Sequence, residues 1–291
     1  MDIYRNDRML NKFLSSLSSF FSYLTPFLLI SAHGGELPVL AASEIRAPLH
    51  PLLNPDTPLP EVKDAHRIPR VLYLTYSDYQ KVPLKVWQRL DEMAPEYDIQ
   101  FYDDTACIDF LSKYFKSEVV KRFNSLVLGA HKADLFRYCL LYVYGGVYFD
   151  IKIKPDVPLH QMFDHERTDI FYGVVSYYGR LFQGVLATYP RNEIFLTLLD
   201  HIMATSDDLV ATSYSIFTAH FRDILQHMLG YTLVSGEHFL NSQLGSIILF
   251  KELNQRENNE TEDRKKGFYG IYTNEAGLIR LMKTRYSDFP W

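Results

Sequence analysis

The stretch Ala130–Pro158, AHKADLFRYCLLYVYGGVYFDIKIKPDVP, joins a helical pattern to a strand pattern through two glycines. In its first half, Asp134 and Arg137 are three residues apart, so they share one face of the predicted helix 131–144. The pair Gly145-Gly146 can take the positive φ that a helix end followed by a sharp turn commonly needs. We therefore predict a helix that stops at Gly145-Gly146 and is followed directly by a strand.

Residues 147–154 alternate between apolar and polar side chains, as a strand does. One predicted face is apolar, and the other carries Tyr148, Asp150, Lys152 and Lys154. A carboxylate can bind a divalent cation or a ribose hydroxyl, and a lysine can neutralise phosphate oxygens. This combination beside a glycine turn is suited to a sugar diphosphate, and we predict an enzyme that acts on activated sugars.

The rest of the domain alternates between strand and helix patterns. Buried strands are predicted at 71–74 and 99–102, and helices at 84–93 and 108–123. Such alternation predicts an α/β fold with a mainly parallel sheet flanked by helices.

The composition of the chain argues against several other classes of protein and of site. The chain has 291 residues, 47% hydrophobic and 22% charged, which is ordinary for a folded protein. A net charge of −5 argues against a nucleic-acid surface. The ten histidines show no zinc-ligand spacing. The two cysteines, Cys107 and Cys139, do not form a disulfide framework, and a buried free thiol is preferred over a bridge between them.

The N-terminal region differs from the rest. Residues 13–35 are uncharged and serine-diluted, and they follow Arg5, Arg8 and Lys12. A signal-anchor, a cleaved signal peptide and an amphipathic or disordered leader all fit this pattern. We divide the chain into this segment (1–35), a proline-rich stem or linker (36–66) and a catalytic domain (67–291).

This plan is typical of single-pass type II proteins of the Golgi or ER lumen. A secreted or cytoplasmic location is the alternative. The sequon at Asn259 lies in a polar run that predicts an exposed loop.

The run ADLFRY at 133–138, followed by YGGVYFD at 144–150, resembles the core of glycosyltransferase family 32, which includes initiating and sphingolipid mannosyltransferases. The resemblance extends from Arg67 to about Pro190. It implies a GT-A fold, a Rossmann-like mixed sheet with the nucleotide-sugar at the strand ends. It also implies retaining transfer of a hexose from GDP-mannose or a UDP-hexose to a glycan or lipid acceptor.

The resemblance also assigns roles. Asp134 and Arg137 would bind the donor sugar, and Asp150 would be the first acid of a D-x-D motif. The second acid is replaced by Lys152. One hypothesis keeps Mn²⁺ or Mg²⁺ on Asp150, helped by Asp156 or Asp288; the other lets the lysine supply the positive charge instead.

Further candidates are weaker. Tyr148, Gln183 and Trp291 are expected near the donor, with an exposed loop amide as an equal alternative for the glutamine. For His238, Asn241 and Asn192 we prefer structural roles. A rival interpretation, favoured by Lys152, is an inactive member that binds a sugar nucleotide or acts as an adaptor.

Overall fold

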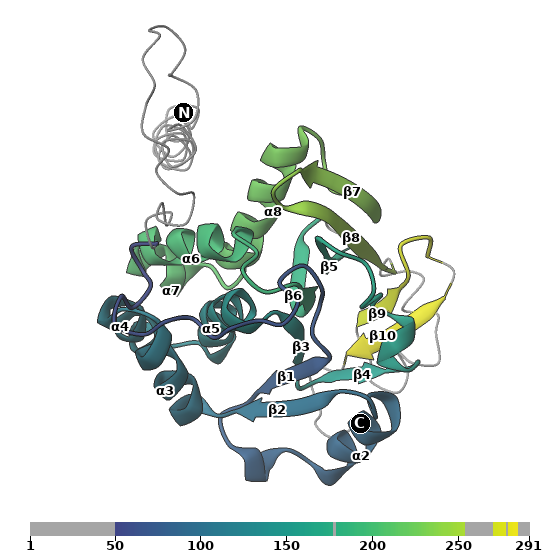
Figure 1. Ribbon diagram of the computed structural model, residues 1–291, viewed down its shortest axis with the longest axis horizontal. Helices are drawn as coiled ribbons and strands as arrows, with labels where there is room; N and C mark the ends of the chain where they lie inside the picture. The colour runs from purple at the N-terminus through teal and green to yellow at the C-terminus, as the bar shows by residue number, and fades with distance from the viewer. Residues whose placement is uncertain (1–49, 177–178, 254–269, 278, 285–291) are drawn as a thin grey trace, which may run out of the picture. The chain divides into compact units, whose positions relative to one another are not determined.

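The structure is a computed structural model that describes residues 50–176, 179–253, 270–277 and 279–284 (Figure 1). The chain divides into two compact units, Met1–Pro48 and Leu49–Trp291. The predicted segment 1–35 and the positions Asn259, Asp288 and Trp291 lie outside the described residues. Among the residues described, no helix has both the length and the apolar character needed to cross a membrane.

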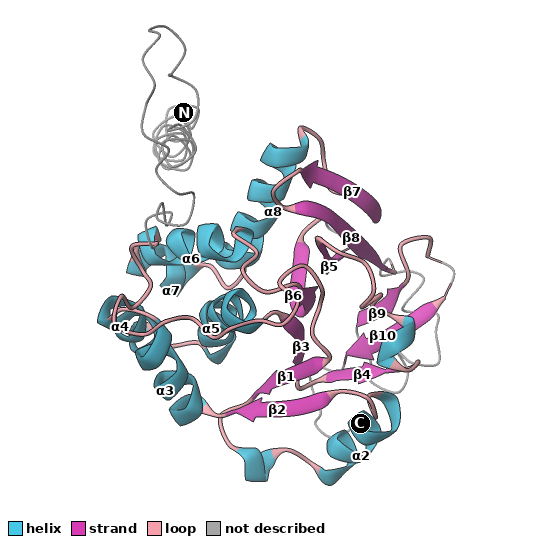
Figure 2. Cartoon of the chain, viewed as in Figure 1, coloured by secondary structure: helices cyan, strands magenta, loops and turns pink. Residues whose placement is uncertain are grey.

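The larger unit contains one mixed sheet and a set of helices (Figure 2). The strands are β1 Val71–Thr75, β2 Asp98–Tyr102, β3 Gly146–Asp150, β4 Ile153–Pro155, β5 Ile170–Val175, β6 Leu181–Thr188, β7 Gly236–Asn241, β8 Gly245–Glu252, β9 Gly270–Thr273 and β10 Arg280–Thr284. The helices are η2 Tyr79–Lys81, α2 Leu84–Met93, α3 Asp104–Tyr114, α4 Ser117–Ser125, α5 Gly129–Tyr144, η3 Leu159–Gln161, α6 Ile194–Ala204, α7 Asp207–Thr212 and α8 Ile216–Leu229.

The strand order is β2-β1-β3-β6-β5-β8-β9-β10-β4, with β7 paired to β8. The α/β class, with a mixed sheet flanked by helices, is confirmed. The expectation that the sheet is mainly parallel is corrected. Strand β1 runs parallel to β2 and β3, and β5 runs parallel to β8, whereas the other described pairings are antiparallel. A parallel pair needs a long crossover, whereas only residues 176–180 separate β5 from β6, a length that suits an antiparallel hairpin.

Each face of the sheet packs against its own apolar layer. Helices α3, α4, α5, α6 and α8 share one core with inward residues such as Tyr148 of β3. Helix α2 and η3 belong to the core on the other face, with Val147 and Phe149. The predicted alternation of β3 is therefore confirmed, and both of its faces are covered.

One predicted helix is interrupted. The helix expected over 108–123 breaks at Phe115, which is extended and forms a β-bridge with Leu53. The amide of Asn54 donates to the Tyr114 carbonyl, and the Lys116 amide donates to the Leu52 carbonyl, both at 2.9 Å. Chain from the predicted stem thus supplies the hydrogen bonds that end one helix before the next begins.

The segment 50–66 has no helix or regular strand, as its proline content predicts. It nevertheless packs on the domain, since Leu53 is 2% exposed and the Pro60 carbonyl accepts from Arg191 at 2.9 Å. The compact unit accordingly begins before Arg67.

Candidate active site

The turn between α5 and β3 determines how the predicted site residues are positioned. Gly145 and Gly146 have φ of 64° and 97°, where side chains are strained. A Cβ on Gly145 would lie 2.5 Å from the nitrogen of Pro190, and one on Gly146 would lie 2.7 Å from the ring of Tyr73. The double glycine therefore lets α5 turn directly into β3. This brings the helix residues Asp134 and Arg137 beside the end of that strand, as predicted.

Arg137 joins the two carboxylates. Its Nη2 lies 3.4 Å from Asp134 Oδ1 and 3.2 Å from Asp150 Oδ1. Its Nε donates to the Ala133 carbonyl at 3.1 Å, and its Nη1 donates to the Gln183 carbonyl. Every nitrogen of the guanidinium thus has an acceptor or a carboxylate within reach, which holds the group in one orientation.

The three groups differ in exposure. The side chain of Arg137 is 4% exposed, that of Asp134 is 9% exposed, and that of Asp150 is 35% exposed. Asp150 is therefore the end of the triad that reaches solvent, with the guanidinium behind it. The residues predicted as a site converge, and the group most available to a ligand is the strand carboxylate.

The burial has electrostatic consequences. Desolvation is the main reason that the pKa of Asp134 rises from 3.8 to about 7; the charge of Asp150 raises it further, and Arg137 opposes the rise. Burial alone would lower the pKa of Arg137, but Tyr148, Asp150 and Asp134 together raise it. The guanidinium stays charged, and Asp134 is the carboxyl whose ionisation the fold disfavours.

Tyr148 lies behind the exposed carboxylate. Its ring is fully buried beneath the guanidinium, with Arg137 Cζ 4.5 Å from the ring centroid. Its hydroxyl donates to Asp150 Oδ1 at 3.3 Å and is 2.7 Å from Thr75 Oγ1. Thr75 faces Asp150 across the parallel β1–β3 pair. We predicted Tyr148 as a donor contact, and the structure places it where it positions Asp150.

Strand β6 closes the site from the other side. Gln183 is 2% exposed, and its Oε1 accepts from the Tyr138 hydroxyl at 2.6 Å. Gly184 lies against Asp150, because a Cβ there would be 2.6 Å from Asp150 Oδ2 and would overlap the Phe182 ring. Sequence reasoning missed Tyr138 and Gly184. Their only sequence signal is adjacency to Arg137 and Gln183.

The residue that replaces the second D-x-D acid lies outside strand β3. Lys152 lies in the turn between β3 and β4, so the single strand predicted over 147–154 is corrected to two. The turn lets β4 leave its neighbour and pair with β10. Asp150 and Lys152 therefore do not share one strand face.

Asp156, the predicted additional metal ligand, is engaged by two cationic side chains. Asp156 pairs with Arg280 at 3.0 Å and with Lys283 at 3.4 Å. The described part of the chain contains no group of three or more His, Cys, Asp or Glu residues placed to hold a metal ion. A cation here would thus be held by Asp150 together with ligands from the substrate, an arrangement that Mg²⁺ commonly accepts.

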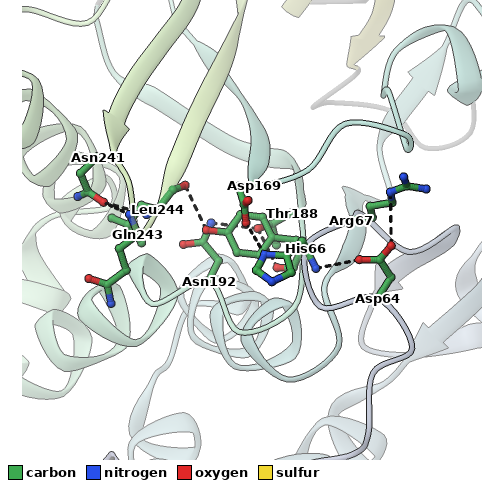
Figure 3. Close-up of polar contacts among 10 residues, drawn as sticks. Asp64, His66, Arg67, Asp169, Thr188, Asn192, Asn241, Gln243 and Leu244 are labelled. Carbon is green, nitrogen blue, oxygen red and sulfur yellow. Dashed lines mark hydrogen bonds and ion pairs between the residues drawn. The ribbon is translucent and has the colours of Figure 1, made fainter.

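Other candidates have the structural roles that we preferred. Both ring nitrogens of His238 are engaged, by the Tyr231 hydroxyl at 2.8 Å and the Val234 carbonyl at 2.9 Å. Asn192 donates to Thr188 Oγ1 at 3.1 Å, and Asn241 caps the following turn by accepting from two backbone amides (Figure 3).

The cysteine prediction is also confirmed. Cys107 and Cys139 are both buried free thiols.

Comparison with known proteins agrees with this geometry. Residues 77–169 match the family model described as a glycosyltransferase sugar-binding region containing a DXD motif. An uncharacterized glycosyltransferase of Acanthamoeba polyphaga mimivirus is 23% identical over 124 residues, which is 43% of this chain and 49% of that protein. The chain thus aligns with about half the length of this relative.

Among solved structures, the PaToxG glycosyltransferase is similar with a TM-score of 0.41 and 15% identity, over 56% of this chain and 71% of that one. A similarity of this size adds nothing to the assignment. The matched region, 77–169, contains all three members of the Asp134–Arg137–Asp150 triad. Through that region the chain resembles glycosyltransferases with a DXD-type sugar-binding region.

Proposed function

We propose that the domain transfers a hexose, with retention, from a nucleoside diphosphate sugar to a glycan or lipid acceptor. The observation that carries this proposal is the convergence of Asp134, Arg137 and Asp150 where β1 and β3 end. In α/β sheets, ligands bind at the carboxyl ends of parallel strands. The family match supports the glycosyl-transfer class, and the donor, the stereochemistry and the acceptor are parts of the proposal.

Each group has a distinct task in this proposal. Asp150, the member of the triad most accessible to solvent, faces the nucleotide and its diphosphate. Arg137 fixes Asp150, and the edges of Asp134 and Arg137 hydrogen-bond the hydroxyls of the donor sugar. Gln183 presents an amide next to them, oriented by Tyr138. Because the groups are held by backbone and ring contacts, little reorganisation is needed when the donor binds.

Bond cleavage places negative charge on the leaving diphosphate, which a cation must stabilise. We propose that Mn²⁺ or Mg²⁺, held by Asp150 and the donor phosphates, supplies this charge when bound. Lys152 is the alternative source. Golgi or ER localisation through the N-terminal segment stays a prediction of the sequence.

A donor panel tests the proposal. The full-length protein is incubated with UDP- and GDP-hexoses, and release of the nucleoside diphosphate is measured with Mn²⁺, with Mg²⁺ and with EDTA. Hydrolysis of one donor is expected, and Asp150→Asn should abolish it. Asp91→Asn, at an exposed position of α2, is the matched control and should leave it unchanged.

The replacement of an acid by Lys152 favours a second candidate, an inactive member that binds a sugar nucleotide without turnover. Saturation-transfer NMR with the same donors separates the two. Binding without hydrolysis under every metal condition supports the inactive member, whereas hydrolysis rejects it. If the protein neither binds nor hydrolyses any of the donors, both candidates are contradicted.

A further inference from the structure

An exposed aromatic ring stands at the end of α5 opposite the glycine turn. Tyr214, in the turn between α7 and α8, is 70% exposed. Lone exposed aromatic residues are ordinary, so exposure alone assigns nothing. The position of this one is set by a buried contact to α5, the helix that carries the active-site triad.

That contact is made by His131, which is fully buried in the first turns of α5. Its Nε2 lies 3.0 Å from the Tyr214 carbonyl, and its ring packs edge-on against Phe217 with centroids 5.0 Å apart. The rings of His131 and Tyr214 are 6.1 Å apart. Because the carbonyl is an acceptor, the histidine donates to it, and the 213–215 turn is fastened to the helix.

His131 also lies close to the triad along α5, about one helical turn before Asp134. His131, Asp134 and Arg137 are spaced by three, so each is a neighbour of the next, with about 4.5 Å of rise between successive members, and the row winds partly around α5. Asp150 lies at the Arg137 end of this row and Tyr214 at the His131 end. Desolvation raises the pKa of Tyr214, the charges of Asp150 and Asp134 raise it further and Arg137 lowers it, so Tyr214 is within electrostatic reach of the triad.

His131, Asp134 and Arg137 are buried, so a ligand reaches this region from the more exposed groups, Asp150 and Tyr214. With the donor bound at the triad through Asp150, the next unit on the solvent side is the one that would meet the ring of Tyr214. The donor ends at its sugar, so that unit belongs to the acceptor. Aromatic faces pack well against the apolar C–H faces of sugar rings, and sites of this kind combine such surfaces with a few polar groups.

We propose that Tyr214 is an acceptor-binding residue, whose ring stacks on the saccharide that receives the transferred hexose. This inference rests on the proposed transferase function. It predicts an acceptor with a sugar ring next to the reacting hydroxyl. It also predicts that Tyr214 is dispensable for donor hydrolysis, in which water takes the acceptor's place.

The test uses full-length protein and methyl glycosides of glucose, galactose and mannose as acceptor probes. Tyr214→Ala should lower kcat/KM for transfer to the preferred glycoside about five- to tenfold, the range expected for losing one aromatic contact. Donor hydrolysis should stay within about twofold of wild type. Tyr214→Phe, which keeps the ring, and Leu209→Ala, another exposed apolar position nearby on α7, should transfer as wild type does.

Saturation-transfer NMR gives a second readout, in which the glycoside signal should disappear in Tyr214→Ala and persist in Tyr214→Phe. Equal transfer by wild type and Tyr214→Ala overturns the inference while leaving the proposed function intact. The inference is also overturned if the wild type hydrolyses donor but shows neither transfer to a glycoside nor binding of one. A wild type without donor hydrolysis or donor binding contradicts the proposed function itself, and the inference with it.

Discussion

Asp134→Asn should make the folded domain more stable at pH 8 and remove its transferase activity. The carboxyl is buried, and the pKa of Asp134 is raised from 3.8 to about 7, mainly by desolvation. Above that pH the fold contains a buried charge that Arg137 only partly compensates. An asparagine keeps an oxygen for Arg137 Nη2 and removes the charge, so a loss of function would accompany a gain in stability.

The sign and size follow from proton linkage. A carboxyl with a raised pKa in the fold binds more protons when folded than when unfolded, so stability falls as pH rises between the two values. The stability that the raised pKa of Asp134 contributes to the fold is fully present below pH 3.8 and is lost above about pH 7. At about 1.36 kcal/mol for each pH unit, the stability of the variant relative to wild type should rise by on the order of 4 kcal/mol between pH 4 and pH 8.

Urea unfolding of wild type and variant, at half-unit steps from about pH 4 to pH 8, measures this change. Asp91→Asn is the control, because this aspartate is exposed on α2 and its curve should run parallel to wild type. Activity is measured as donor hydrolysis at pH 7.5. Parallel stability curves for wild type and Asp134→Asn would refute the electrostatic reasoning, and full hydrolysis by the variant would refute its proposed place at the donor sugar.

Three further predictions follow from close approaches and from the cation requirement. Gly184→Ala should reduce donor hydrolysis at least tenfold, because its methyl group would lie 2.6 Å from Asp150 Oδ2; a stability loss of about 1–3 kcal/mol is expected in urea, and unchanged kinetics would contradict the contact. Gly245→Ala should cost about 3 kcal/mol or more, since φ is 67° and a Cβ would overlap the Asp169 carbonyl; a thermal midpoint equal to wild type would reject this. Dialysis against EDTA should abolish donor hydrolysis and Mn²⁺ should restore it, whereas undiminished activity would favour Lys152 as the source of charge.

The sequence by itself determined the centre of the site. Helical spacing placed Asp134 and Arg137 on one face, and two adjacent glycines implied a turn that only residues without a Cβ can make. Strand alternation put Asp150 opposite the apolar face of β3. These are local consequences of backbone geometry, so they can be derived without knowing which distant segments pack nearby.

The surroundings of the site were decided by the tertiary structure. Gly184 lies against Asp150, and Tyr138 orients Gln183, only because β6 pairs with β3 in one particular antiparallel register. Likewise, the break at Phe115 exists because residues more than 50 positions earlier supply its hydrogen-bonding partners. The hydrophobic periodicity of one segment does not predict such contacts, because they join two segments that are far apart in the sequence. Sequence spacing therefore specifies which groups share an element, and strand pairing specifies which elements meet.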